Sequence, residues 1–283
     1  MTQKRNVDLV VISDIHLGTY GCQAEALSNY LNSICPKTVV LNGDIIDIWQ
    51  FKKRYWPKSH MKIIKHILNW VTEGVTVYYV TGNHDELLRK FAGFEMNSFK
   101  VVNKVVLTLE DKKAWIFHGD VFDVTMQYSK WLTKLGAIGY DILILINNIV
   151  NKISQFFGKG KISLSKRIKD SVKSAVKFIN NFEETASDIA ITNGYDYVIC
   201  GHIHQPKIRT YSNSNGLVQY LNSGDWIENL TSLEYHNGQW TIFYYKEEDF
   251  KNNSIYDNYD NTEKSNKELF NALLNEFNIS KNY

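Results

Sequence analysis

Five short apolar runs, each ending in a cluster of polar residues, constrain the fold of this 283-residue chain more than any other feature. The runs span residues 9–12, 38–41, 75–80, 114–117 and 197–200. They are short and rich in β-branched and aromatic residues, which predicts buried strands. Segments with helical spacing, 24–34 and 61–71, separate the first three runs, and this alternation predicts a layered α/β domain. After Cys200, closely spaced strand candidates between turn signals predict an antiparallel part.

The polar clusters contain complementary residue types. They are SDIHLG (13–18), NGDIID (42–47), TGNHDE (81–86), FHGDVFD (117–123) and CGHIHQP (200–206). Because the carboxyl ends of parallel strands meet at one edge of a sheet, we expect these clusters to lie together. Imidazoles and carboxylates without a thiolate suit manganese, iron, cobalt or zinc better than calcium or magnesium.

The spacing within two clusters adds to this expectation. Asp14 with His16, and His202 with His204, are two residues apart, so on an extended segment each pair would point to one face. A carboxylate such as Asp44 can bridge two metal ions. A single histidine after a strand is more often a hydrogen-bonded core residue than a ligand. The order of all five clusters therefore carries the prediction of a metal site.

The order D-x-H, GD-x-x-D, GNHD/E, H and GHxH resembles that of the calcineurin-like metallophosphoesterase superfamily, from about Leu9 to Tyr245. The resemblance implies an α/β (α+β) fold in which a two-sheet β-sandwich is flanked by helices. It also implies two divalent metal ions, with manganese favoured and iron or zinc as alternatives, and hydrolysis of a phosphoester or diphosphate without a covalent enzyme intermediate.

Site residues follow from the resemblance position by position. One ion would be held by Asp14, His16, Asp44 and His204, and the other by Asp44, Asn83, His118 and His202. His84 would then be the catalytic histidine near the leaving-group oxygen, oriented by Asp85 or another carboxylate. A helix N-terminal role is the alternative for Asp85. Asp47, Asp120 and Asp123 are expected to orient ligands or hold the loops together.

Two features are similar to the branch that contains UDP-2,3-diacylglucosamine diphosphatase, an enzyme of lipid A biosynthesis that releases UMP. They are the stretch LNSGDWIENLTSLEY (221–235) and a long helical insertion between the HGD and GHIH motifs. The branch resembled has arginine at the position of His84 and a shorter insertion. A related hydrolase acting on another lipid-linked or nucleotide diphosphate therefore remains an alternative. A non-catalytic scaffold is a third reading, although such a protein would be expected to have lost ligands.

Domain boundaries follow from the change in pattern along the chain. We expect a metallophosphoesterase domain at 1–124 and 181–248, a helical insertion or lid at 125–180, and a tail at 249–283 with a C-terminal helix. The insertion holds ten basic and two acidic residues. It is either a helical subdomain with a solvated basic face or a lid that touches anionic membrane and lipid chains.

The stretch WQFKKRYWPK (49–58) supplies the expected substrate contacts. Lys53 and Arg54 would clamp a diphosphate and Trp56 would stack a uracil, with a surface loop of snorkelling side chains as the alternative.

A net charge of +2 argues against general nucleic-acid binding, and three scattered cysteines predict neither disulfides nor a thiolate zinc site. No apolar segment of signal-peptide length opens the chain. The expected location is cytoplasmic, with peripheral contact to the inner face of the membrane through 125–180.

Overall fold

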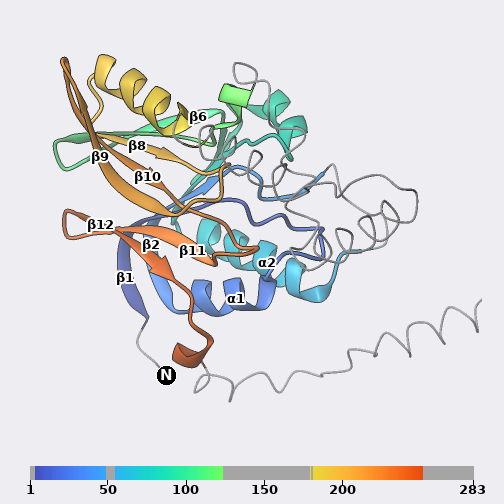
Figure 1. Ribbon diagram of the computed structural model, residues 1–283. Helices are drawn as coiled ribbons and strands as arrows, with labels where there is room; N and C mark the ends of the chain where they lie inside the picture. The colour runs from blue at the N-terminus through green and yellow to red at the C-terminus, as the bar shows by residue number, and fades with distance from the viewer. Residues whose placement is uncertain (1–3, 49–54, 124–178, 180, 251–283) are drawn as a thin grey trace, which may run out of the picture. The chain divides into compact units, whose positions relative to one another are not determined.

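The computed structural model describes residues 4–48, 55–123, 179 and 181–250 (Figure 1). Two compact units divide the chain after Tyr245. The first holds the two β-sheets and their helices. Of the second, the described residues form one short 3₁₀ helix, η3 (Glu247–Asp249).

Seven strands form the larger sheet, in the order β12–β11–β1–β2–β3–β5–β4. Their bounds are β1 Arg5–Ile12, β2 Ile34–Asn42, β3 Thr76–Val80, β4 Glu95–Met96, β5 Phe99–Val102, β11 Thr231–His236 and β12 Gln239–Tyr244. Strands β1, β2, β3 and β5 are parallel neighbours, whereas β11 and β12 extend the sheet on the β1 side as antiparallel strands. Helices α1 (Ala24–Asn32) and α2 (Lys58–Thr72) connect the first three strands.

Five strands form the smaller sheet, in the order β6–β7–β8–β10–β9. Their bounds are β6 Lys104–Leu109, β7 Lys112–Phe117, β8 Tyr197–Cys200, β9 Lys207–Asn213 and β10 Gly216–Asn222. The central strands β7, β8 and β10 run parallel, and β6 and β9 close the edges as antiparallel strands. Two short 3₁₀ helices, η1 (Glu86–Phe91) and η2 (Asp120–Phe122), follow β3 and β7.

The core lies in layers because strand side chains alternate between two faces. In β1, Leu9 and Val11 belong to a cluster shared by the two sheets, while Val10 and Ile12 belong to a cluster shared with α1 and α2. A third cluster packs the helical residues 181–192 on the outer face of the smaller sheet. Each buried aliphatic side chain of this kind stabilises the fold by about 1.5–3 kcal/mol.

This architecture confirms the predicted α/β sandwich flanked by helices. The expected antiparallel part after Cys200 is only partly antiparallel. The pairs β9–β10 and β11–β12 are hairpins in different sheets, and β10 runs parallel to β8. Residues 95–109 form three strands that the apolar runs did not predict.

The insertion and the tail remain predictions. Residues 125–180 and 249–283 lie almost entirely outside the described part of the chain, as do Lys53 and Arg54. Among the residues that are described, no helix combines the length and the hydropathy needed to cross a bilayer.

Candidate metal centre

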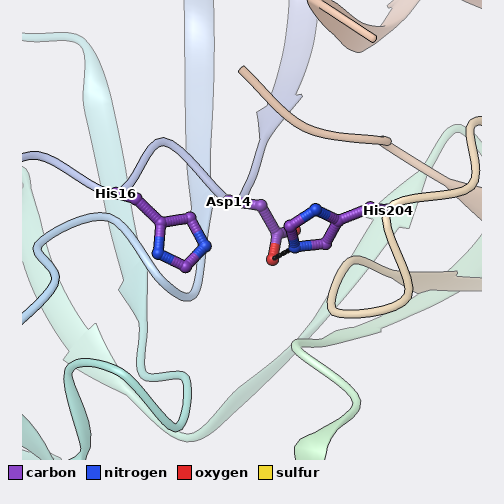
Figure 2. Close-up of side chains that lie close together, drawn as sticks. All are labelled: Asp14, His16 and His204. Carbon is purple, nitrogen blue, oxygen red and sulfur yellow. Dashed lines mark ion pairs between the residues drawn. The ribbon is translucent and has the colours of Figure 1, made fainter. Parts of the chain in front are cut away.

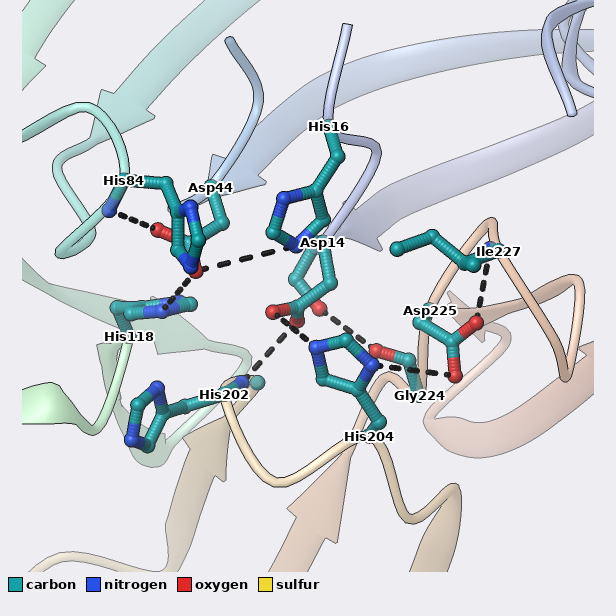
Figure 3. Close-up of polar contacts among 12 residues, drawn as sticks. Asp14, His16, Asp44, His84, His118, His202, His204, Gly224, Asp225 and Ile227 are labelled. Atoms are coloured by element: carbon teal, nitrogen blue, oxygen red, sulfur yellow. Dashed lines mark hydrogen bonds and ion pairs between the residues drawn. The ribbon is translucent and has the colours of Figure 1, made fainter. Parts of the chain in front are cut away.

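The predicted site residues follow the carboxyl ends of strands from both sheets. Asp14 and His16 come after β1, Asp44 after β2, Asn83 and His84 after β3, His118 after β7, and His202 and His204 after β8. Figure 3 shows most of these side chains converging where the two sheet edges meet. The site is therefore assembled from two sheets rather than from the edge of one.

Among the described residues, three groups of side chains could hold a metal ion, and two of them consist entirely of expected ligands. Asp14, His16 and His204 form one (Figure 2), and Asp44, His118 and His202 form the other; within each, the ligand atoms lie within 4.8 Å of one another. The Oδ2 atom of Asp44 is 3.2 Å from His118 Nε2 and 4.0 Å from His16 Nε2. Asp44 thus reaches toward both clusters.

The backbone at these positions is strained. Nine non-glycine residues have positive φ in the part of the chain that the structure describes, and five of them are expected ligands. They are Asp14, His16, Asp44, His202 and His204, with φ between 52° and 66°. Non-glycine residues rarely adopt this left-handed region, and when they do they tend to cluster at functional sites.

This conformation corrects the reasoning from extended spacing. Asp14 and His16 do lie in one cluster, but both are left-handed and follow the end of β1. His202 and His204, which a strand would point the same way, divide between the two clusters. The turn after β8 therefore supplies one imidazole to each.

In several of these histidines a hydrogen bond to one ring nitrogen leaves the other nitrogen facing the site. His118 Nδ1 lies 2.9 Å from the carbonyl oxygen of Asn42, and His16 Nδ1 lies 3.0 Å from Asp47 Oδ2. When Nδ1 donates, Nε2 keeps its lone pair for a metal ion. On His202 the roles are reversed, because Nε2 lies 2.9 Å from Asp123 Oδ1.

Several buried atoms fit a metal ion. Among the described residues, His16 Nε2 and Asn83 Oδ1 make no hydrogen bond; Asp14 Oδ1 and His118 Nε2 make none either, but they form ion pairs with His204 at 3.1 Å and Asp44 at 3.2 Å. Leaving a buried acceptor unsatisfied costs about 1–3 kcal/mol, and a cation coordinated by these atoms would remove that cost. Oxygen and imidazole donors together also match the first-row divalent metals.

The charges of the site also favour a bound cation. Burial by itself would raise the pKa of Asp44, but the imidazoles of His118 and His16 hold that pKa below its ordinary value. Burial lowers the pKa of His204, yet the carboxylate of Asp14 outweighs it and raises the pKa to about 9. The carboxylates therefore stay ionised and the site favours bound cations.

Asp47, rather than Asp85, is the carboxylate that contacts His84. Asp47 Oδ2 lies 2.9 Å from His84 Nδ1 as well as 3.0 Å from His16 Nδ1, so it holds two imidazoles. Asp85 accepts hydrogen bonds from the backbone N–H groups of Gly82 and Ile45 and from the Tyr79 hydroxyl, none of which is an imidazole. Its side chain makes no capping bond to η1 either. Asp85 instead ties the loop after β3 to the loop after β2.

The family model of the calcineurin-like phosphoesterases matches residues 7–206. The chain belongs to this family. It is accordingly a metal-dependent phosphoesterase, a hydrolase, and not the scaffold considered above.

Curated relatives of this phosphoesterase carry a more specific name. The UDP-2,3-diacylglucosamine hydrolase of Blochmanniella pennsylvanica is 24% identical over 78% of this chain and 88% of its own length. That of Vibrio cholerae is 26% identical over 79% and 93%. Among solved structures, an archaeal phosphodiesterase is 14% identical, covers 83% of this chain and 98% of its own, and has a TM-score of 0.42.

Of the expected substrate contacts, Trp56 lies among the described residues. Trp56 is half-buried against the core cluster of the larger sheet, and its ring centroid lies 5.7 Å from that of His60. The stacking of Trp56 on a uracil remains a prediction.

Asp225 is a site residue that the sequence reasoning missed. It follows the end of β10, is fully buried, and places Oδ2 3.8 Å from His204 Nδ1. It also accepts backbone hydrogen bonds from Ile227 (Figure 3) and from Glu228, which fix the loop beside His204. The signal was present in the sequence, since SGDW follows a strand candidate as the other clusters do.

Proposed function

We propose that this phosphoesterase hydrolyses the diphosphate of UDP-2,3-diacylglucosamine and releases UMP, using two divalent metal ions. The observation that carries the proposal is the pair of ligand clusters with Asp44 between them. The relatives supply the substrate, since they align over most of both chains at 22–26% identity.

The proposed ligand sets are those of the family resemblance. Asp14, His16, Asp44 and His204 would hold one ion; Asp44, Asn83, His118 and His202 would hold the other. Manganese is the proposed metal, with iron and zinc as alternatives. When bound, such ions lower the pKa of a coordinated water and neutralise charge on phosphoryl oxygens.

The chain's own residues position the reaction. The backbone N–H of His84 donates to Asp44 Oδ1 at 2.8 Å and so fixes the shared carboxylate. Asp47 lies at Nδ1 of His84, which leaves Nε2 as the atom that would hold a proton toward the leaving-group oxygen. Asp47 also contacts His16, so one carboxylate orients both a proposed ligand and the proposed acid.

The finer parts of the proposal concern the lipid. Acyl chains need an apolar surface, which the insertion at 125–180 would provide, and Lys53 and Arg54 would contact the diphosphate. A lipid-linked substrate also fits a cytoplasmic enzyme in peripheral contact with the inner membrane face. The branch resembled has arginine at the position of His84. This difference favours one alternative substrate, another lipid-linked or nucleotide diphosphate.

Product analysis tests the proposal. Manganese-loaded protein is incubated with UDP-2,3-diacylglucosamine and the products are identified by mass spectrometry, beside Asn83→Ala and the surface control Asn193→Ala. UMP should form with wild type and Asn193→Ala and should be absent with Asn83→Ala. Intact substrate, with bis-p-nitrophenyl phosphate still cleaved, would reject this substrate and retain the metal-dependent chemistry.

A further inference from the structure

The imidazole of His202 lies between two segments that are far apart in the sequence. Its Nε2 atom is 2.9 Å from Asp123 Oδ1, and its ring centroid is 6.4 Å from that of Phe182, at an interplanar angle of 38°. Both are direct contacts. Asp123 is the last described residue before the predicted insertion at 125–180, and Phe182 is the second residue after it. The same imidazole is therefore contacted from both ends of the predicted insertion.

The position of Phe182 is fixed by close packing. Phe182 is fully buried, and its ring lies edge-to-face with that of Phe122 at a centroid distance of 5.4 Å. A Cβ added to Gly119 would lie 2.7 Å from Phe182 Cζ and 3.4 Å from His202 Cβ, so both side chains lie against the bare backbone that follows His118. In a close-packed interior, the Phe182 ring leaves His202 little room to rotate.

The next residue anchors the start of the helix at 181–192. Glu183 is fully buried, and its carboxylate accepts hydrogen bonds from Lys207 Nζ at 2.6 Å and from the Tyr211 hydroxyl at 2.5 Å. Lys207 and Tyr211 belong to β9, which begins five residues after His202. Because breaking a buried ion pair is strongly destabilising, these bonds fix the helix to the strand that follows the His202 loop.

The backbone of His202 is held as well, so the remaining freedom of this residue is the rotation of its ring. The His202 N–H donates to Asp14 Oδ2 at 3.1 Å, and the ring centroid lies 5.1 Å from that of His118 (Figure 3). With Nε2 at Asp123, Nδ1 is the atom left for a metal ion beside Asp44. A ring that turned freely would have to be ordered when an ion binds, at a cost in affinity.

We propose that Asp123 and Phe182 are positioning residues that hold the His202 imidazole in the orientation a metal ion requires. The inference rests on the proposed function, since that function places His202 in one of the two ion sites. Asp123 sets the tautomer of the imidazole, and Phe182 limits the rotation of its ring. Metal binding and the packing of Phe182 on His202 are then linked, so that each stabilises the other.

Manganese titration of the full chain tests the proposal. Electron paramagnetic resonance reports free manganese, so the dissociation constant of each ion is measured without an activity assay. The test variants are Asp123→Ala and Phe182→Leu; the second keeps a large apolar side chain in the core. Ile191→Ala is the matched control, because Ile191 lies in the same helix and core cluster but packs near Gly216, at the start of β10.

We expect each test variant to bind one ion like wild type and the other more weakly. The loss should be about 10–100-fold for Asp123→Ala, which removes the hydrogen-bond partner of a ligand. For Phe182→Leu it should be on the order of tenfold, the cost of ordering one side chain. Excess manganese should restore kcat for bis-p-nitrophenyl phosphate in both, because the ligands are intact. Ile191→Ala should bind both ions like wild type despite its lower stability.

Wild-type affinity for both ions in the two test variants would overturn the proposal. An equal loss of affinity in Ile191→Ala would also overturn it, because any loss of stability would then weaken the site. Wild type that binds fewer than two ions would reject the two-ion centre and this proposal together. Two bound ions without release of UMP would reject only the proposed substrate.

Discussion

Replacing Gly82 by alanine should damage the metal centre through a single methyl group. A Cβ at this position would lie 2.3 Å from Asp44 Oδ1, 2.6 Å from Asp44 N and 2.9 Å from His118 Cδ2. Since ordinary contacts begin near 3.4 Å, the Asp44 carboxylate would have to move by about 1 Å. Misplacing a catalytic group by that distance costs about 100-fold in rate, or about 2.7 kcal/mol. Overpacking should also lower the free energy of unfolding by about 1–3 kcal/mol.

The assay is kcat/KM for bis-p-nitrophenyl phosphate at saturating manganese, together with thermal unfolding. Gly21→Ala is the control, because a Cβ there meets only Ile227 Cγ2 at 3.4 Å, and neither glycine has a left-handed φ. We expect the control to keep its rate and stability. A Gly82→Ala enzyme with near wild-type kcat/KM would refute the argument that bare backbone beside Asp44 is required.

Three further outcomes are expected. Chelation with EDTA should lower the thermal midpoint and manganese should restore it, because the buried ligand atoms lose their cation; an unchanged midpoint in differential scanning fluorimetry would contradict this. Asp47→Asn should lower kcat by about 10–100-fold with little change in KM, since His16 and His84 share this carboxylate; an altered KM alone would argue against it. Burial lowers the pKa of His60 below 6.5, and the N–H of Gly18 donates to its Nδ1, so the folded state holds the neutral ring. Protonation then favours the unfolded state, and wild-type urea midpoints should fall as pH drops below about 6.5, less steeply in His60→Asn.

The sequence predicted those strands whose apolar pattern matches a buried position in the fold. The runs that became β1, β2, β3, β7 and β8 are continuous apolar stretches because these strands are buried on both sides. Strand β6 was missed because its residues alternate between exposed and half-buried positions, and β4 because it is only two residues long.

The candidate site was predicted as a set of residue types, and its detailed geometry was not. The order of the five motifs identified which residues are expected to bind metal. The choice of Asp47 rather than Asp85 as the partner of His84 depends on how the loops after β2 and β3 cross, which no spacing reveals. Asp225 was missed because its cluster, SGDW after β10, was not counted among the polar clusters that follow apolar runs.

The left-handed backbone at five expected ligands has an evolutionary consequence. Each such residue costs about 1–2 kcal/mol relative to a relaxed conformation, whereas glycine adopts it freely. A change such as His204→Gly would relieve this strain, but it would also remove the ion-pair partner of the buried Asp14 carboxylate, 3.1 Å away, which costs more. In a lineage that no longer needed hydrolysis, backbone strain would favour glycine at these positions, whereas the charge pairs inside the centre would favour keeping the imidazoles.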